Sequence, residues 1–296
     1  MTAKQNIVLI TGATSGIGRE TALHLARLGH RVLATGRKPA LLAELEAEAG
    51  PLPLETFTLD VNDPASIDAA VQEVETRTAG HGIDVLVNNA GFGNMAPMEL
   101  ITDADMRGMF ETNVFGLVRL CQRFLPAMRA RGAGKIINVS SVVGRLVLPL
   151  QGIYCATKHA VEALTDALRV EVAGLGIHVS LVEPGSIATH FGATATSTVS
   201  KYETMDSPYR EGVRTYQRVL EKTYQKAPGP QCIAKTVARI IRRRRPAARY
   251  VSPRFNALAI WFFRWFPTRF MDGILRRVMG LTPKALRAPR ASRNAS

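Results

Sequence analysis

Tyr154 and Lys158 stand four residues apart in the segment YCATK and could act as one chemical unit. On a helix, this spacing places two side chains on one face, where they can touch. A free phenol has a pKa of about 10, but an ammonium group held beside it favours the phenolate. We therefore predict that Tyr154 exchanges a proton with the oxygen of an alcohol or a ketone. The spacing alone is also that of an ordinary surface pair, so other motifs have to decide.

Ser141 precedes Tyr154 by thirteen residues and ends the apolar segment IINVSS, 136–141. This segment predicts a buried strand that runs into a loop. From there the Ser141 hydroxyl could polarise the same substrate oxygen. Tyr154 as the base, Lys158 as the cation that shifts its pKa, and Ser141 as the hydrogen-bond donor would then meet in one site.

A glycine-rich stretch, TGATSGIG at 11–18, follows the first apolar run. Residues 7–11 predict a strand buried on both faces of a parallel sheet, and a helical pattern continues to Leu28. Glycines let the backbone approach a phosphate closely, and the start of the helix offers amide donors. The spacing GxxxGxG is one residue off the usual dinucleotide fingerprint. A plain glycine turn is the alternative interpretation.

The residues after the second predicted strand, 31–35, bear on the choice of cofactor. NAD sites place an acid at the end of this strand, where it accepts hydrogen bonds from the ribose. Here the chain continues as Gly36-Arg37-Lys38, with two cations and no carboxylate. Such cations would bind a 2′-phosphate, so NADP(H) is favoured over NAD(H). The alternative is a solvated loop with ordinary basic residues.

Strands and helices continue to alternate, which predicts an α/β domain with a doubly wound parallel sheet. Ligands of such sheets bind at the carboxyl ends of the strands, where each candidate binding residue falls. The predicted helices cover 39–49 and 64–79, and the predicted strands cover 54–59 and 83–87, ending at Asp60-Val61 and at NNAG, 88–91.

Further motifs follow in a fixed order: Asn113 within TNVFG, Ser141, YCATK at 154–158, and Pro184-Gly185 after a sixth apolar run. Together with TGATSGIG and NNAG, they resemble the motifs of the classical short-chain dehydrogenase/reductase family. The resemblance covers about residues 5–190. It implies a Rossmann fold and an oxidoreductase in which a hydride moves between nicotinamide and the substrate carbon while Tyr154 handles the proton.

The resemblance also implies a role for each matching residue. Asn113, Ser141, Tyr154 and Lys158 would form a catalytic tetrad, with Ser140 as the rival of Ser141. Asn113 would distort its helix and hold a water that relays protons from the lysine. The implied cofactor contacts are Gly12, Thr14, Ser15, Gly16, Ile17, Gly18, Arg37, Asp60, Val61, Asn88, Ala90, Gly91, Lys158, Pro184, Gly185 and Thr189.

The segments LATGRK and YCATKHAVEAL, with the tail, resemble the branch that contains 17-beta-hydroxysteroid and retinol dehydrogenases. This likeness implies a lipophilic substrate such as a steroid, a retinoid or a long-chain carbonyl compound. By the same resemblance, long helices at 103–131 and 151–173 would form the interfaces of a homodimer or homotetramer.

The positive charge of the chain is concentrated at its C-terminal end. Of 38 Lys and Arg residues, 15 lie from Arg239 onward, with Asp272 as the one acid there, and the net charge is +14. Aromatic residues beside arginines at 255–270 are typical of a helix at a lipid headgroup boundary. Peripheral membrane contact through 254–280 competes with packing over the substrate pocket or against a dimer partner. Nucleic acid is not expected, because bulky apolar residues interleave the arginines.

Residues 1–253 are expected to form the catalytic domain, and 254–296 a C-terminal helical extension. The substrate lid is expected at about 186–230, with a mobile loop over 193–198 and a helix over 209–224. After it come a helix at 231–243 and an edge strand at 248–251, and the last dozen residues are expected to be disordered.

Three scattered cysteines, Cys121, Cys155 and Cys232, suggest neither a disulfide framework nor a metal site. The apolar run 7–10 is too short for a signal peptide, so a cytoplasmic location is expected, with peripheral membrane contact as the open addition. The run 257–263 is far below the ~20 residues that span a bilayer.

We predict an NADP(H)-dependent oxidoreductase that interconverts a carbonyl and an alcohol on a lipophilic substrate. The alternative is a non-catalytic protein on the same fold, either an NADP(H) sensor or a membrane-surface scaffold. The complete tetrad argues against a sensor, because a pure sensor has no use for a tuned tyrosine.

Overall fold

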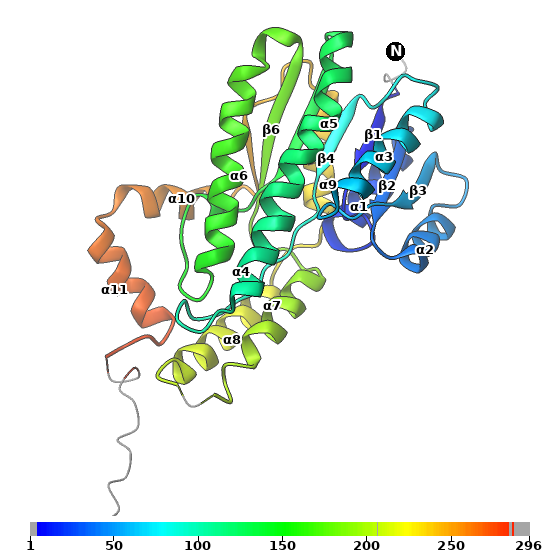
Figure 1. The fold of residues 1–296 in the computed structure, drawn as a ribbon. Helices are drawn as coiled ribbons and strands as arrows, with labels where there is room; N and C mark the ends of the chain where they lie inside the picture. The colour runs from blue at the N-terminus through cyan, green and yellow to red at the C-terminus, as the bar shows by residue number, and fades with distance from the viewer. Residues whose placement is uncertain (1–4, 206, 284–285, 287–296) are drawn as a thin grey trace, which may run out of the picture.

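A sheet of seven parallel strands forms the centre of the computed structural model, which describes residues 5–205, 207–283 and 286 (Figure 1). The strand order, β3-β2-β1-β4-β5-β6-β7, reverses between β1 and β4 and leaves a crevice at their carboxyl ends. This confirms the predicted doubly wound sheet. The strands are β1 (Ile7–Ile10), β2 (Arg31–Gly36), β3 (Leu54–Thr58), β4 (Val85–Asn88), β5 (Gly134–Val139), β6 (Ile177–Pro184) and β7 (Arg249–Ser252).

Helices cover both faces of the sheet, which explains why the strands are almost continuously apolar. Alternate residues of one strand enter different cores: Val8 and Ile10 pack in the first, and Leu9 packs in the second. The first core is closed by α1 (Gly16–Arg27), α2 (Pro39–Ala49) and α9 (Gln231–Arg242), and the second by α3 (Pro64–Arg77), α5 (Gly116–Arg131) and α6 (Gly152–Glu171).

The helix predicted over 103–131 consists of three consecutive helical pieces. α4 (Asp103–Phe110) leads into a π-helical turn, η1 (Glu111–Phe115), which continues as α5. Within η1, the Asn113 amide donates to the Phe92 carbonyl at 2.8 Å, and its oxygen accepts from the Phe92 N–H at 3.0 Å. Such π turns are frequent at functional sites. The distortion expected at Asn113 is confirmed.

The lid contains two helices, α7 (His190–Ser200) and α8 (Arg210–Gln225), so the prediction of a structureless loop over 193–198 is wrong. Phe191, Ala195 and Val199 recur every four residues and pack on one side of α7. Threonine and serine favour helices weakly and can bond to their own backbone, as Ser197 does to the Thr194 carbonyl at 2.9 Å. These residues concealed the apolar stripe. The predicted second helix is confirmed.

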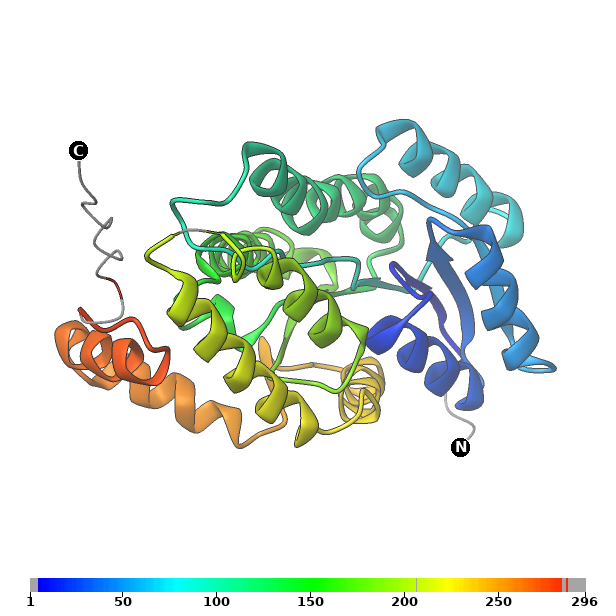
Figure 2. The ribbon, with the colours of Figure 1, turned by 90° about the horizontal axis from the view of Figure 1, so that it is seen from below.

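The chain after α9 adds β7 to the outer edge of β6, as predicted, and then forms α10 (Asn256–Trp265) and α11 (Thr268–Val278). Figure 2 shows these two helices, in orange, beside the yellow-green lid helices. Ile260 and Met279 are buried in the same apolar cluster as Tyr154, which confirms packing over the pocket region. Apart from Leu286, the last dozen residues lie outside the described residues. Within the described chain, no helix has both the length and the apolar character needed to cross a bilayer.

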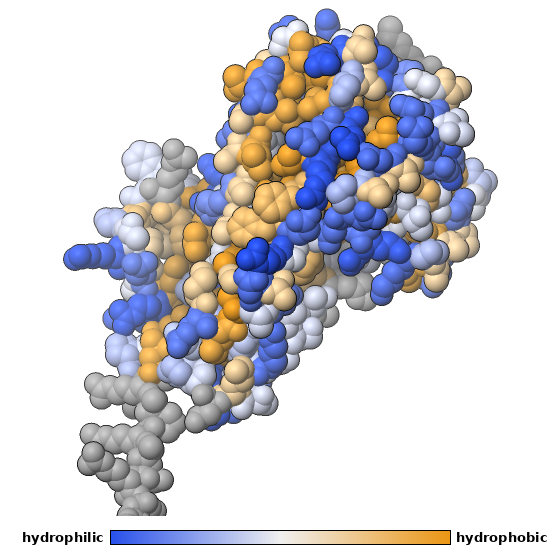
Figure 3. Space-filling view, in the orientation of Figure 1, coloured by the Kyte–Doolittle hydropathy of each residue, from blue (hydrophilic) through white to orange (hydrophobic). Residues whose placement is uncertain are grey.

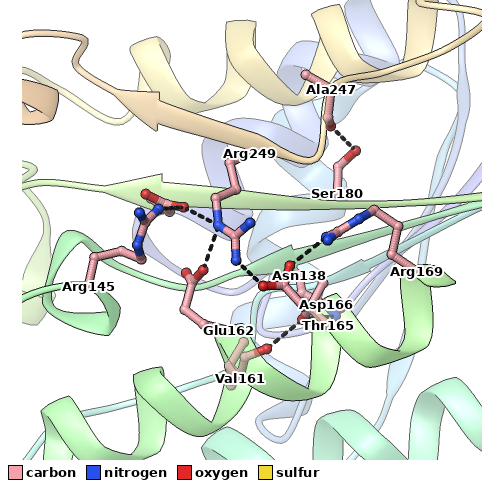
Figure 4. Close-up of polar contacts among 11 residues, drawn as sticks. Asn138, Arg145, Val161, Glu162, Thr165, Asp166, Arg169, Ser180, Ala247 and Arg249 are labelled. Atoms are coloured by element: carbon pink, nitrogen blue, oxygen red, sulfur yellow. Dashed lines mark hydrogen bonds and ion pairs between the residues drawn. The ribbon is translucent and has the colours of Figure 1, made fainter. Parts of the chain in front are cut away.

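A cluster of charged side chains lies between β6, β7 and the back of α6 (Figure 4). The Arg249 Nε atom is 3.1 Å from a carboxylate oxygen of Glu162 and 3.2 Å from one of Glu183, and its other nitrogen pairs with Asp166. Arg145 approaches Glu183 at 3.4 Å. Because the Glu183 side chain is fully buried, its charge depends on these two arginines. Burial, together with the nearby Glu162, raises the pKa of Glu183 to about 7.

Replacing Arg249 with alanine is expected to lower the free energy of unfolding by about 3–5 kcal/mol, because it leaves two buried carboxylates without their shared cation. Arg169→Ala is the matched control, since its partner Asp166 is far more exposed than Glu162 and Glu183, and its loss should cost under about 1 kcal/mol. Urea unfolding followed by circular dichroism measures both values. Equal losses would mean that Arg249 has no special structural role.

Candidate active site

A cavity of about 450 Å³ opens at the carboxyl ends of β1, β4, β5 and β6, between the sheet and the lid. Its size lies within the usual range of small-molecule binding pockets. It brings together residues predicted from motifs far apart in the sequence. The predicted residues that line it are Gly12, Thr14, Ser15, Gly16, Ile17, Arg37, Asp60, Val61, Ala90, Gly91, Ser141, Tyr154, Lys158, Pro184, Gly185 and Thr189.

Three predicted site residues, Gly18, Asn88 and Asn113, lie behind the wall of the cavity. Asn88 is buried in β4, where its amide donates to Asn138 Oδ1 at 2.9 Å and to Cys121 Sγ at 3.4 Å. Its predicted cofactor contact is therefore corrected to support of the sheet beneath the site. Gly18 lets α1 approach the glycine loop, because a Cβ there would lie 2.3 Å from the Gly12 carbonyl oxygen.

Asn89 lines the cavity and was missed in the sequence, although it is the second asparagine of the NNAG motif. Its amide donates to the carbonyl oxygens of Thr11 at 2.9 Å and Gly12 at 3.2 Å. In return, the Thr11 hydroxyl accepts from the backbone N–H groups of Asn89 and Ala90, at 3.1 and 3.0 Å. These four hydrogen bonds fasten the glycine loop to the loop after β4, on either side of the crevice.

The glycine loop at the start of α1 places glycines where the backbone lines the cavity. Gly12 has a φ of +65°, and a Cβ there would lie 2.9 Å from Ala90 Cα. Ser15, the N-cap of α1, makes no side-chain cap, so the first amides of this helix remain as donors beside the cavity. A helix start with open amides and no bulky side chain is suited to a phosphate group.

Arg37 is exposed where β2 ends and lines the same side of the cavity. It forms no ion pair with any acid in the part of the chain that the structure describes. Gly36 just before it packs against Thr14, whose methyl group would lie 2.5 Å from an added Cβ. The glycine loop, the start of α1 and the Arg37 cation together fit a nicotinamide dinucleotide.

Lys158 is held at the bottom of the cavity, 6% exposed, and donates to the Val139 carbonyl at 2.9 Å. Its ammonium nitrogen is 5.9 Å from the centre of the Tyr154 ring. Burial lowers the pKa of Lys158 to about 8, and the charge of Glu162, one helical turn away, acts in the opposite direction. Lys158 is thus still mainly protonated at neutral pH. Gly91 lies beside this nitrogen, and a Cβ there would come within 3.0 Å of the Asn113 side-chain oxygen.

Tyr154 is 7% exposed, and its ring packs against Phe191 with 5.4 Å between ring centres. Burial, followed by the nearby Tyr224, raises the pKa of its phenol above the ordinary value, although a hydrogen bond with Ser141 lowers it. This is the opposite direction from the lowering expected beside Lys158, because burial is the largest influence on this pKa. The phenol is protonated at neutral pH and is suited to donating a proton.

Ser141 and Ser140 differ in surroundings. The Ser141 hydroxyl donates to the Pro184 carbonyl at 3.3 Å, accepts from the Val143 N–H at 3.3 Å, and contacts Tyr154. Ser140 also lines the cavity but is only 3% exposed, and its hydroxyl lowers the pKa of the Glu162 carboxyl. This contrast favours Ser141 as the serine that faces a substrate.

The remaining wall of the cavity is apolar and was not predicted residue by residue. Tyr216, Leu220 and Tyr224 recur every four residues along α8, so the helical pattern of the lid contained this signal. Among its polar groups, Gln151 donates to the Tyr216 hydroxyl at 2.8 Å. Further apolar lining residues include Met95, Leu148, Phe191, Val219 and Met279. Among residues 5–283 as described, no group of three or more His, Cys, Asp or Glu could hold a metal.

The sequence is similar to oxidoreductases over most of its length. A family model described as short chain dehydrogenase matches residues 6–200. A 3-ketodihydrosphingosine reductase of Bacteroides thetaiotaomicron is 34% identical over 271 residues, covering 91% of this chain and 96% of that protein. Human 17-beta-hydroxysteroid dehydrogenase type 1 is 34% identical, covering 83% of this chain and 77% of that protein.

Solved structures agree with this similarity. A serine dehydrogenase in its closed form with NADP+ has a TM-score of 0.72 and 30% identity, covering 83% of this chain and 93% of that one. A short-chain dehydrogenase from Burkholderia phymatum with NAD has a TM-score of 0.76 and 25% identity, covering 93% and 96%. The protein therefore belongs to the classical short-chain dehydrogenase/reductase family and is an oxidoreductase.

Proposed function

We propose that the protein reduces the carbonyl group of a lipophilic compound with NADPH. The observation that carries this proposal is the buried Tyr154, which lines the cavity beside Ser141 and Lys158, together with apolar side chains of the lid. A protonated phenol can donate to an oxygen that becomes negative during reduction. In the opposite direction the tyrosine would first have to lose its proton in an apolar environment, which burial disfavours.

Each polar residue at the site has a distinct proposed task. Bound NADPH supplies the hydride to the carbonyl carbon. Ser141 donates a hydrogen bond to the carbonyl oxygen, and Tyr154 donates the proton. Lys158 holds its positive charge near both groups. Asn113 fixes the backbone at Phe92 and, through Thr157 at 3.1 Å, the helix that carries Tyr154 and Lys158.

The preference for NADP(H) is inferred from Arg37. Its guanidinium can bind a 2′-phosphate with charge-assisted hydrogen bonds, and no acid follows β2 to receive the ribose hydroxyl of NAD. The NADP+ complex among the solved relatives supports this choice, while the NAD complex shows that the fold accepts either cofactor.

A lipophilic substrate is inferred from the lid. Phe191, Leu220 and Met279 offer apolar contacts, and a site of this kind orients its ligand with few polar groups. Relatives named for 3-ketodihydrosphingosine and 17-beta-hydroxysteroids support a steroid-like or long-chain carbonyl compound.

Assembly and membrane contact complete the proposal. Phe115, Leu164 and Val170 are exposed on the α5–α6 side, where Figure 3 shows an orange apolar strip. This strip supports the expected homodimer or homotetramer, because exposed apolar patches commonly mark interfaces. Residues 254–280 are proposed to meet a membrane surface.

A panel of ketones and aldehydes with NADPH tests the reaction directly. Oxidation of NADPH, followed by its absorbance, should be fastest with long-chain or polycyclic carbonyl compounds. Tight NADPH binding without turnover on any compound would favour the sensor alternative.

Tyr154→Phe should lower kcat by about 10²–10⁴-fold, because it removes the proton donor while keeping the ring. The Kd for NADPH, measured by fluorescence, should stay nearly unchanged. Tyr224→Phe is the matched control in the same cavity and should retain most of kcat. A large loss of NADPH binding in Tyr154→Phe would instead make the tyrosine structural.

Arg37→Asp should shift the ratio of kcat/KM for NADPH over NADH by at least about tenfold toward NADH, since a charged hydrogen bond is replaced by repulsion. Arg27→Asp makes the same charge change at an exposed position outside the cavity and should leave the ratio unchanged. An unaltered ratio in Arg37→Asp would remove this residue from the phosphate site.

A further inference from the structure

The outer side of α10 and α11 exposes large aromatic residues that no described part of the chain covers. Trp265 and Leu258 are each 71% exposed, Phe255 is 65% exposed and Trp261 is 55% exposed. Apolar groups of this size rarely gather on the surface of a monomer unless they bind something. We call the following set the aromatic–arginine face: Phe255, Leu258, Trp261, Trp265, Phe266 and Phe270, with Arg254, Arg269, Arg276 and Arg277.

The exposed aromatic residues lie on a different side of these helices from the residues that pack inside the protein. Ile260 and Phe263 turn inward to the apolar cluster that contains Tyr154, and Met271 is buried on α11. α10 is therefore apolar on two sides, only one of which is used inside the protein. A row of aromatic contacts continues from α10 to α11, with ring centres 4.1 Å apart for Phe262–Phe266 and 5.4 Å apart for Phe266–Phe270.

The arginines of this face are exposed and lie among the aromatic residues. Arg254, Arg269, Arg276 and Arg277 form no ion pair with an acid anywhere in the described chain. In Figure 3, blue and orange atoms alternate over the part of the surface formed by α10 and α11. A positive face of this kind calls for a negative partner, so it is poorly suited to a second copy of itself, which would bring the same charge.

The length of the helices decides between crossing a membrane and lying on it. α10 has 10 residues and α11 has 11, and each is about half the length required to span a bilayer. Tryptophan and phenylalanine on one side, with arginines that reach the phosphates, are the features of helices that lie in the headgroup region.

The same extension reaches the cavity. Met279, just after α11, lines the cavity, and Leu281 lies against the start of α8, 2.4 Å from where a Cβ on Gly212 would be. The lid helix is thus in contact with the segment that carries the aromatic–arginine face. A bilayer bound to this face would therefore lie next to the segment that contacts the lid helix α8.

We infer that the aromatic–arginine face docks the protein on the surface of an anionic lipid bilayer. The aromatic side chains enter the headgroup boundary, and the four arginines bind lipid phosphates. Docking itself is independent of the reaction. That it delivers a lipophilic substrate to the cavity rests on the proposed function.

Flotation of the full chain with lipid vesicles tests the docking. The wild-type protein should float with vesicles of phosphatidylcholine containing about one third phosphatidylglycerol, and much less with phosphatidylcholine alone. Trp261→Ser with Trp265→Ser should reduce the floated fraction at least tenfold. Arg276→Gln with Arg277→Gln should reduce it on anionic vesicles and weaken its dependence on salt. The matched control is Arg27→Gln with Leu28→Ser, which changes an exposed arginine and an exposed apolar residue at the end of α1 and should float like wild type.

Two results would overturn the proposal. One is equal flotation of wild type and both tail variants. The other is no flotation of wild type, with an oligomer in gel filtration that the tryptophan variant dissociates, because a second copy would then cover this face. Circular dichroism of every variant checks the fold. Flotation without turnover on any carbonyl compound would reject the proposed reaction and leave the docking intact.

Discussion

The site depends on a buried ammonium group whose hydrogen-bond partner is a main-chain carbonyl. Lys158 donates to Val139 at the end of β5, so its charge is not neutralised by direct pairing with an acid. Burying such a charge is unfavourable unless other groups compensate at a distance. The nearby Glu162 opposes the fall in the pKa of Lys158.

Glu162 connects this cation with the far edge of the sheet. It is held by Arg249, which comes from β7, and β7 follows the lid and α9 in the chain. Arg249 also pairs with the fully buried Glu183. This residue directly precedes Pro184, which ends β6 at the cavity. The edge strand β7 therefore pairs with β6 and also supplies the arginine that balances the charges of Glu162 and Glu183 behind α6. The family motifs end near residue 190 and therefore do not include Arg249.

Local patterns were sufficient to predict the sheet, the glycine loop and the Tyr154–Lys158 pair, because apolar runs and glycine turns act over a few residues. They did not predict α7, since Thr and Ser conceal the stripe formed by Phe191, Ala195 and Val199. They also failed for the pKa of Tyr154, because burial depends on Phe191 and the lid, which are distant in sequence. Asn88 was assigned to the cofactor since its partner Asn138 lies fifty residues away and no local signal links the two.

The lid side of the cavity comes largely from a later part of the chain than the side that carries Tyr154 and Lys158. The residues proposed to transfer the proton fall within 6–200, whereas Tyr216, Leu220 and Tyr224 come from α8 and Met279 directly follows α11. Substitutions in this later part of the chain would reshape the space for a ligand while leaving the sequence motifs that carry Tyr154 and Lys158 unchanged. Ligand choice and reaction chemistry can therefore diverge independently during evolution, and gene duplicates that keep one chemistry could specialise on different molecules through changes in the lid side alone.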